Sequence, residues 1–454
     1  MLRGLVDQVL EGVTHLVLRG FFRSVESVGL DRVPRRRPVV VVANHFYGFV
    51  DPVLLVSALG RVPRFLAKAS LWRRPLARPF LSLAGLVPIG SPSRDETTAR
   101  NAAAFSFSVR VLRGKGMVAL FPEGITHDVP QLAPLRTGAA RLALHAAAAG
   151  ARGVIILPVG LMYDDKLALR SRALVRVGEP VDLDAELRDG LRSAAACGDG
   201  DHAAVRRLTT LIEQRLRAVV PDYPDFRLAA VLSRAAEIAL RARRGDDGVV
   251  PLAERDALAQ RLVRAPAAMT DRLIDALARY VLDLDLLGLR DHHLARAVGQ
   301  RELLGAALTT GAQVVALAPL AIVGLVGNLL PFWCTRRAGR VAAAPVSKGT
   351  ARLLVALVTF PAMWLGLGVA AVNVTGRGWP VGVAAVALLA LGGLATVHCL
   401  ERIVRVRRAW RGRIALRDRR TLLADVRADR QRVVAMVAEA EASAHLTGEA
   451  AREA

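Results

Sequence analysis

The chain has 454 residues and a formal net charge of +23, and it is 53% hydrophobic and 23% charged. Its mean hydropathy of +0.34 excludes an intrinsically disordered chain, because disorder requires low hydropathy. Three widely spaced cysteines, Cys197, Cys334 and Cys399, form no zinc-binding motif and exclude a disulfide-stapled secreted scaffold. Two broad classes remain: a membrane protein that contacts anionic lipid or substrates, and a nucleic-acid binder.

Residues 1–30 predict an N-terminal amphipathic helix. Apolar residues recur at helical spacing from Leu2 to Val17. Asp7 and Glu11 interrupt the apolar run that a signal peptide would need. Such a helix more commonly packs on its own domain, and the alternative is an interfacial helix that lies on a membrane.

Residues 31–182 alternate strand-like and helix-like segments. The strand-like runs are 39–43, 117–121, 154–159 and 174–180, and the helix-like patterns are 97–112 and 137–149. This alternation is typical of an α/β domain with a mostly parallel sheet flanked by helices. Sheets of this kind place their ligands at the carboxyl ends of the strands.

Two further regions follow the predicted α/β domain. Residues 183–303 are rich in Ala, Leu, Arg and Asp, and predict four or five amphipathic helices that form a cap or spacer. Residues 304–400 form a membrane region, because 353–372 and 381–400 are each about 20 apolar residues, the length that crosses a bilayer. The short link between them predicts a transmembrane helical hairpin.

A third apolar run, residues 306–333, contains Pro319 and Pro331 and is expected to be broken there. Basic clusters follow this run and follow the hairpin, whereas the link inside the hairpin holds only Arg377. The positive-inside rule places both clusters in the cytoplasm, which favours a re-entrant or interfacial first segment, with a proline-broken span as the alternative. The basic helical tail, residues 401–454, is either a solvated helix or a segment that attracts anionic lipid.

His45 and Asp51 follow the predicted strand at 39–43 and are the candidate catalytic pair. A carboxylate can orient an imidazole and support its cation while the other ring nitrogen takes a proton. The chain has no GxSxG nucleophile motif, so this base is expected to activate a substrate hydroxyl. A histidine near an aspartate is, taken alone, more often structural, and further blocks are needed to decide its role.

Three further blocks occur in order after this one. Leu86–Gly90 leads to Arg94, Phe121–His127 follows a predicted strand, and Ile156–Gly160 ends the series. Together with Asn44–Pro52, these blocks resemble the glycerolipid acyltransferase family, which acylates glycerol-3-phosphate and lysophosphatidic acid. The motifs cover roughly residues 20–180. Looser similarity beyond the motifs resembles a subgroup with a C-terminal membrane region.

The resemblance also implies which residues bind the acceptor. Glu123 and Gly124 match family residues that bind glycerol phosphate, and Glu123 is expected to accept hydrogen bonds from hydroxyls or to orient an arginine. Residues 125–127 are Ile-Thr-His where Thr-Arg-Ser is commonest, so the usual arginine is missing. A phosphate contact is expected instead from Arg94, Arg136 or Lys68.

The resemblance also implies direct acyl transfer without a covalent enzyme intermediate. His45 would deprotonate a glycerol hydroxyl, Asp51 would fix the imidazole tautomer, and the alkoxide would attack the thioester of acyl-CoA or acyl carrier protein. Five residues separate the pair where four are commonest, and Gly48 can absorb the extra residue in a turn. No metal or organic cofactor is implied, and the catalytic domain is expected on the cytoplasmic side of a membrane.

Three functions compete at this point. The first is acylation of glycerol-3-phosphate, with the acyl thioester and anionic membrane lipids as partners. The second is acylation of lysophosphatidic acid or another lysolipid. The third is a non-catalytic lipid-binding membrane protein, against which the intact His45, Asp51 and Glu123 argue. Nucleic-acid binding is not expected, because aromatic residues make up only 5% of the chain and no known binding module is present.

Overall fold

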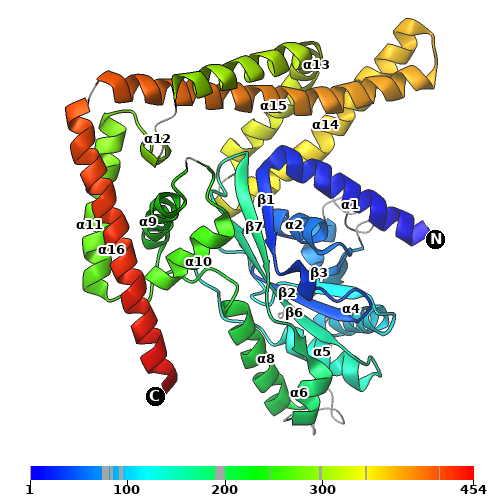
Figure 1. Ribbon diagram of the computed structural model, residues 1–454. Helices are drawn as coiled ribbons and strands as arrows, with labels where there is room; N and C mark the ends of the chain where they lie inside the picture. Colours follow the sequence, from blue (N-terminus) through cyan, green and yellow to red (C-terminus); the bar gives the residue numbers. More distant parts are fainter. Residues whose placement is uncertain are drawn as a thin grey trace. The chain divides into compact units, whose positions relative to one another are not determined.

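The structure is a computed structural model that describes residues 2–73, 81, 85–90, 96–189, 200–246, 248–295, 299–342, 345–418 and 420–453. The chain forms two compact units. The first consists of Met1–Asp225 together with Pro345–Gly349, and the second of Phe226–Ala344 together with Thr350–Ala454. The first unit contains a sheet with helices, whereas the second is helical (Figure 1).

One mixed sheet organises the first unit. Its strands are β1 (Phe22–Val28), β2 (Val39–Ala43), β3 (Arg64–Lys68), β4 (Val87–Ile89), β5 (Met117–Leu120), β6 (Ile155–Tyr163), β7 (Ser171–Val177) and β8 (Val181–Asp182). They lie in the order β1-β7-β6-β2-β5-β3-β4, with β8 also beside β6. Strands β2 to β6 are parallel to one another, whereas β7 and β8 are antiparallel to β6. The predicted α/β fold with a mostly parallel sheet is confirmed.

Strand β2 lies at the centre of the sheet because it is apolar on both faces. All five of its residues are 0% exposed, and it pairs in parallel with β5 on one side and β6 on the other. Strands that are buried on both faces are near-continuous runs of this kind. The three strands point the same way, so the loops that follow β2 and β5 meet at one edge of the sheet, beside the end of β6.

Helices of the first unit pack against this sheet. They are α1 (Leu2–Phe21), α2 (Val50–Leu59), α4 (Glu96–Arg113), α5 (Gly138–Ala148), α6 (Leu183–Asp189) and α8 (His202–Arg217), with short 3-10 helices η1 (Leu30–Arg32) and η2 (Ala69–Arg73). The main hydrophobic core joins α4, α5 and α8 to the sheet face that carries Val40 and Val42. This core holds β2 and β5 rigidly, and with them the loops that carry the candidate catalytic residues.

The N-terminal helix α1 packs on its own domain, and its membrane-interface role stays a prediction. Leu18 and Phe21 are buried, and α1 packs against α2 and β1. Val9, Val13 and Leu16 are exposed by 58%, 43% and 39% and lie at helical spacing on another face. The helix is therefore docked on its own domain and also presents an apolar stripe.

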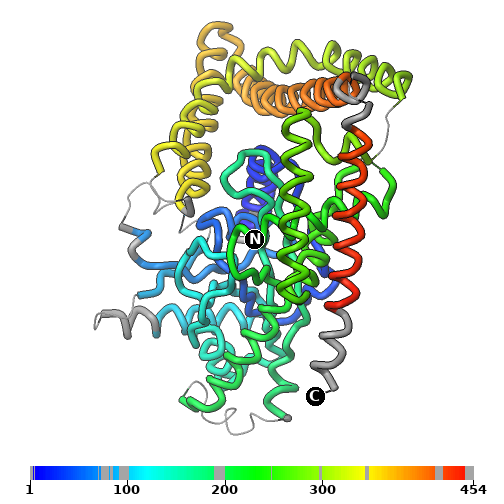
Figure 2. Tube along the Cα trace, turned by 90° about the vertical axis from the view of Figure 1, so that its left-hand side faces the viewer, coloured from blue at the N-terminus to red at the C-terminus, as the bar shows by residue number. Residues whose placement is uncertain are grey.

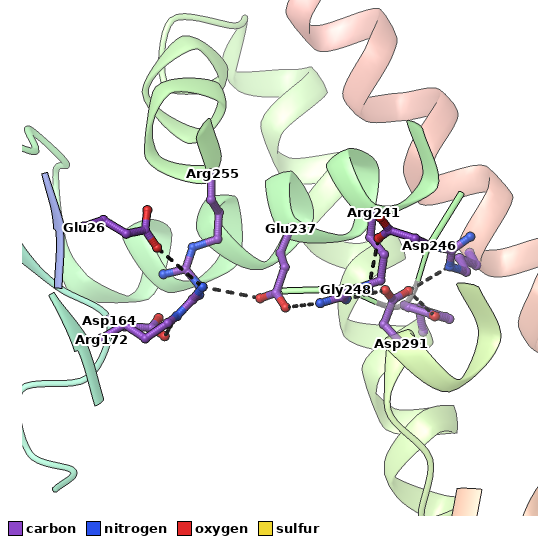
Figure 3. Close-up of polar contacts among 11 residues, drawn as sticks. Glu26, Asp164, Arg172, Glu237, Arg241, Asp246, Gly248, Arg255 and Asp291 are labelled. Carbon is purple, nitrogen blue, oxygen red and sulfur yellow. Dashed lines mark hydrogen bonds and ion pairs between the residues drawn. The ribbon is translucent and has the colours of Figure 1, made fainter. Parts of the chain in front are cut away.

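A buried polar cluster holds together the helices of the second unit that precede and follow its apolar helices. These helices are α9 (Phe226–Arg244), α10 (Leu252–Leu262), α11 (Ala267–Leu286), α12 (Asp291–Ala295) and α16 (Arg420–Glu453). Asp291 accepts hydrogen bonds from Arg241 at 2.7 Å, and from Tyr280 and Arg430 at 2.8 Å each. Figure 3 shows Arg241 pointing toward Asp291. Burial alone would raise the pKa of Asp291, but its bonds to Arg430 and Arg241 outweigh that effect and lower the pKa below its ordinary value.

Three helices of the second unit are long and apolar enough to cross a membrane: α13 (Gln300–Val341), α14 (Pro345–Thr375) and α15 (Trp379–Asp418). Helices α14 and α15 follow one another, joined by residues 376–378, and their crossing of a membrane as a hairpin stays a prediction. The prediction that 306–333 is broken at its prolines was wrong, because α13 is one helix of 42 residues through Pro319 and Pro331. Proline is tolerated inside a helix where neighbouring helices support it, and α13 packs closely along α15 (Figure 2).

Candidate active site

The candidate catalytic pair forms where the loop after β2 enters α2. His45 follows β2 directly, and Asp51 lies in the first turn of α2. His45 Nδ1 lies 2.8 Å from Asp51 Oδ2, with the Asp51 side chain fully buried and the His45 side chain 18% exposed. With Asp51 ionised, Nδ1 carries the ring proton, and the opposite ring nitrogen, Nε2, is left to accept one.

A tight turn closes the five-residue interval between the pair. Gly48 has a φ of +60°, in the left-handed region that glycine adopts without strain. The backbone N–H of Asp51 donates to the Gly48 carbonyl at 3.2 Å, and that of Tyr47 donates to Asp51 Oδ2 at 2.8 Å. The extra residue therefore leaves the carboxylate within reach of the imidazole.

Tyr163 is a further contact of Asp51 that the sequence did not indicate. Its hydroxyl lies at the end of β6 and donates to Asp51 Oδ1 at 2.5 Å. Burial, and then the charge of Asp51, raises the pKa of the Tyr163 phenol well above its ordinary value, so the hydroxyl stays protonated and donates. Both oxygens of Asp51 are thus hydrogen-bonded, one to Tyr163 and the other to His45 and the Tyr47 amide.

Ring stacking and a side-chain amide fix the loop that carries His45. The His45 ring stacks on Phe121 at 4.1 Å between centroids, with the planes 12° apart. The buried Asn44 side chain donates to the Leu161 carbonyl at 2.9 Å and accepts from the Leu161 amide at 2.7 Å. Asn44 therefore ties the end of β2 to β6.

Glu123 is fully engaged with protein groups. It lies in the loop after β5, and its side chain is 0% exposed. One carboxylate oxygen accepts from the His45 amide at 2.8 Å, and the other accepts from the Ala133 amide at 2.9 Å and contacts His127 Nε2. These contacts organise the loops around His45, and the carboxylate has no exposed surface for a glycerol hydroxyl.

Gly124 and Arg136 lie side by side. Gly124 has a φ of +70°, in the left-handed region that favours glycine, and a Cβ added there would lie 2.5 Å from Nε of the flexible Arg136 side chain. The Arg136 amide donates to the Pro122 carbonyl at 2.8 Å, and its side chain is exposed. An exposed guanidinium at this edge of the sheet can contact an anionic ligand.

Two other sequence predictions have different outcomes. Arg94, the other phosphate-binding candidate, lies outside the described residues. His127, which received no role, proves to be the partner of Glu123, and its ring packs edge-on against Phe46 at 5.1 Å. A histidine four residues after a carboxylate was the available signal for that pair. Across the residues that the structure describes, no group of three His, Cys, Asp or Glu side chains is arranged to hold a metal.

Comparison with known proteins places this geometry in a family context. Residues 24–162 match the family model named Acyltransferase. The chain is 30% identical over 229 residues to glycerol-3-phosphate O-acyltransferase 2 of Saccharomyces cerevisiae, a match that covers 48% of this chain and 29% of the yeast protein. It is 24% identical over 298 residues to glycerol-3-phosphate O-acyltransferase 1 of the same yeast, covering 47% of this chain and 39% of that protein.

A solved structure resembles part of the chain more distantly. The 1-acyl-sn-glycerophosphate (LPA) acyltransferase PlsC from Thermotoga maritima is 19% identical with a TM-score of 0.31, covering 44% of this chain and 81% of that one. The chain spans about a third of the length of the two yeast relatives, 29% of one and 39% of the other. The family model contains the loops of His45, Asp51 and Glu123, so the part of the chain that carries the candidate active site is similar to the Acyltransferase family.

Proposed function

We propose that the protein is a membrane-bound O-acyltransferase that moves a fatty acyl group from an acyl thioester to a hydroxyl of glycerol-3-phosphate. The observation that carries this proposal is the His45–Asp51 pair, in which a buried carboxylate holds one ring nitrogen and leaves the other for a substrate proton. The donor is acyl-CoA or acyl carrier protein. Similarity to two yeast proteins named glycerol-3-phosphate O-acyltransferases supports the choice of acceptor.

The pair performs the transfer as a general base and its orienting carboxylate. His45 Nε2 takes the proton of the acceptor hydroxyl as the hydroxyl oxygen bonds to the thioester carbonyl carbon. The tetrahedral intermediate then collapses, the carbon–sulfur bond breaks, and the proton passes from His45 to the departing thiolate. Asp51 stabilises the imidazolium between these steps. Atoms balance with a thiol and an acyl ester as the products.

The loop after β5 supports this pair and adds a charge for the acceptor. Glu123 accepts a hydrogen bond from the His45 amide and so fixes the backbone that carries the base. Arg136, exposed beside Gly124, is the described arginine best placed to bind the acceptor phosphate. Arg94 remains a second candidate for that contact.

The apolar helices and the net charge fit a lipid product. Three long apolar helices support membrane association. With α14 and α15 as the two spans, the basic segments that follow α13 and α15 favour a cytoplasmic catalytic domain. A net charge of +23 attracts anionic donors, acceptors and membrane lipids. A membrane-bound enzyme can release an acylated product directly into the bilayer.

The test uses membranes that contain the full chain, supplied with labelled glycerol-3-phosphate and acyl-CoA. General-base catalysis contributes about 10²- to 10⁴-fold, so His45→Ala should lose at least about a hundredfold of the rate. His145→Ala is the matched control, because His145 lies on α5, away from the His45 and Glu123 loops, and packs against Phe105. Label in lysophosphatidic acid that disappears in His45→Ala supports the proposal.

The same assay identifies the outcomes that contradict it. Transfer that occurs only with lysophosphatidic acid as acceptor moves the enzyme to a second acylation step. Transfer supported by acyl carrier protein and not by CoA changes the donor alone. A failure of every acceptor and both donors to show His45-dependent transfer points to a non-catalytic lipid-binding protein.

A further inference from the structure

A segment remote in sequence completes the first unit beside the catalytic loop. Pro345–Gly349, the first residues of α14, belong to this unit although about 120 residues separate them from its main part. Gly349 is buried against the Tyr47 ring. A Cβ added at Gly349 would lie 2.2 Å from Tyr47 Cε2 and 2.5 Å from Cζ, closer than real Cβ contacts occur. Any other residue at 349 must therefore displace the tyrosine ring or its own helix.

Tyr47 has little freedom to absorb such a displacement. Its side chain is 1% exposed and is among the largest fully buried side chains of the chain. Its ring meets the Tyr163 ring edge-on at 5.0 Å between centroids, with 65° between the planes. Interiors are close-packed, so a shift of one buried ring is transmitted to its neighbours.

Besides His45, Asp51 accepts hydrogen bonds from two groups, the Tyr47 amide and the Tyr163 hydroxyl, and the Tyr163 ring packs against the Tyr47 ring. The Tyr47 amide donates to Asp51 Oδ2 at 2.8 Å, the same oxygen that contacts His45. The Tyr163 hydroxyl donates to Asp51 Oδ1 at 2.5 Å. A continuous series of contacts therefore runs from Gly349 through Tyr47 and Tyr163 to the carboxylate that orients the base.

We propose that Gly349, Tyr47 and Tyr163 are positioning residues. Through them, the geometry of the His45–Asp51 pair depends on how the first turn of α14 packs against Tyr47. The proposal rests on the proposed acyltransferase function, because it concerns the geometry of the same pair. None of the three residues needs to touch substrate. Their effect is on the turnover of bound substrate, since they set the orientation of the base and not the contacts that bind donor or acceptor.

The chain offers a closely matched pair of variants for the test. Gly349→Ala adds a methyl group against Tyr47, whereas Gly366→Ala adds one in the same helix where nothing lies within 4 Å. Alanine favours a helix over glycine at both positions, so helix propensity is equal in the two variants. The full chain is measured in membranes for kcat, for the KM of each substrate and for the amount inserted.

The expected result is a kcat at least about tenfold lower for Gly349→Ala, with both KM values and the inserted amount unchanged and Gly366→Ala like the wild type. Tyr163→Phe removes only the hydroxyl that holds Asp51, and should lower kcat by a similar factor with unchanged KM. In a double variant with Tyr47→Leu, the smaller side chain leaves room for the methyl group. Gly349→Ala should then add little to the loss caused by Tyr47→Leu alone.

A second measurement does not require acyl transfer. The rate at which diethyl pyrocarbonate modifies His45, followed by peptide mass spectrometry, should rise in Gly349→Ala and Tyr163→Phe as the hold on Asp51 loosens. It should stay unchanged in Gly366→Ala. An inactive wild type would overturn the proposed function and leave this measurement to decide the positioning role. Unchanged kcat and unchanged His45 modification in Gly349→Ala would overturn the inference itself.

Discussion

Two buried carboxylates organise the candidate active site by accepting backbone amides as well as side chains. Asp51 accepts hydrogen bonds from the Tyr47 amide and the Tyr163 hydroxyl in addition to its contact with His45. Glu123 accepts hydrogen bonds from the His45 and Ala133 amides and contacts His127. Each carboxylate therefore fixes loop geometry, and buried charges of this kind are tolerated because several donors satisfy them.

This arrangement gives Glu123→Gln a distinct expected effect. The carboxylate accepts from three donors, whereas a glutamine presents an NH₂ group that must face one of them. We expect kcat to fall about 10- to 100-fold, the size of a lost hydrogen bond to a charged group, with the acceptor KM nearly unchanged. Glu179→Gln is the control, because Glu179 is exposed and pairs only loosely with Arg32 at 3.8 Å. A raised acceptor KM at normal kcat would instead mean that Glu123 binds the acceptor.

Residue patterns predicted one part of this site and missed another. His45, Asp51 and Glu123 lie just after predicted strands, where a parallel sheet gathers its loops, so their proximity followed from the α/β pattern. Tyr163 is the last residue of a strand that is otherwise mostly buried and apolar. Nothing in the neighbouring sequence marks its hydroxyl as a partner for Asp51. A hydrogen bond between two segments so far apart in sequence requires the strand register to be known first.

At the scale of elements, α13 and α15 approach each other through glycines. Gly324 of α13 lies against Gly392 of α15, where an added Cβ would be 1.9 Å from the Gly392 carbonyl carbon. Asn328 donates to the Leu389 carbonyl at 3.0 Å and accepts from Trp364 Nε1 of α14 at 2.7 Å. Small residues that admit close contact and polar side chains that bridge helices are the usual means of association in membranes.

Gly324→Ala should therefore separate α13 from α15. Overpacking a close contact costs about 1–3 kcal/mol, which we expect to appear as a lower unfolding temperature of the detergent-solubilised protein. Gly311→Ala, on the same helix with nothing within 4 Å of its added methyl group, should leave that temperature unchanged or raise it. Equal stability of the two variants would show that the glycine contact does not hold the helices together.

Acid should loosen the cluster around α12. Burial first, and then the charges of His293 and Arg241, lowers the pKa of His292 from 6.5 to about 4. The unfolded chain therefore binds a proton before the folded one does, so stability is full above pH 6.5 and falls as the pH drops from 6.5 toward 4. The protection factors of the amides at 291–295, which are corrected for the slower intrinsic exchange in acid, should fall between pH 7 and pH 5, and His292→Asn should flatten that dependence.

The control for this effect is an exposed histidine. His202→Asn, at the start of α8, should leave the pH dependence at 291–295 as in the wild type. His293 contributes in the same direction, because burial and Arg290 lower its pKa as well. The double variant should therefore be flatter than His292→Asn alone, and an unaltered slope in both variants would assign the acid sensitivity to other groups.

Strand prediction succeeded where a strand is buried on both faces, and it missed β1, β3 and β4. Strand β2 is a run of apolar residues, and its neighbours β5 and β6 have the same character. Strand β1 is an edge strand that carries Arg23, Glu26 and two serines, and it begins directly after α1 without a turn signal. Exposed edges are polar in many proteins, so composition hides them from a search based on hydrophobic runs.

At the scale of the whole molecule, the excess of 63 Lys and Arg over 40 Asp and Glu would act on the proposed substrates before they bind. Acyl-CoA, acyl carrier protein and glycerol-3-phosphate are all anionic. A strongly positive protein raises their encounter rate through its long-range field. That field is screened by salt, with a Debye length of about 10 Å at 0.1 M and about 3 Å at 1 M.

The proposed enzyme should therefore show a salt dependence in kcat/KM that is absent from kcat. We expect kcat/KM for acyl-CoA to fall several-fold between about 0.1 M and 1 M salt, because screening removes steering without changing the chemistry of bound substrate. An uncharged acyl thioester of N-acetylcysteamine is the control donor and should show little change. A parallel loss of rate with both donors would indicate that salt alters the protein rather than the encounter.

Because Pro345–Gly349 belong to the first unit, translation completes that unit only after most of the chain has been made. A ribosome releases the sheet, its helices and the whole of α13 before residue 349 emerges. Until then Tyr47 lacks the glycine against which it is buried, and the catalytic pair is left without its last support. A nascent chain halted before this point would hold His45 and Asp51 without the Gly349 contact beside them, so the proposed enzyme would reach its full rate only after the start of α14 is made.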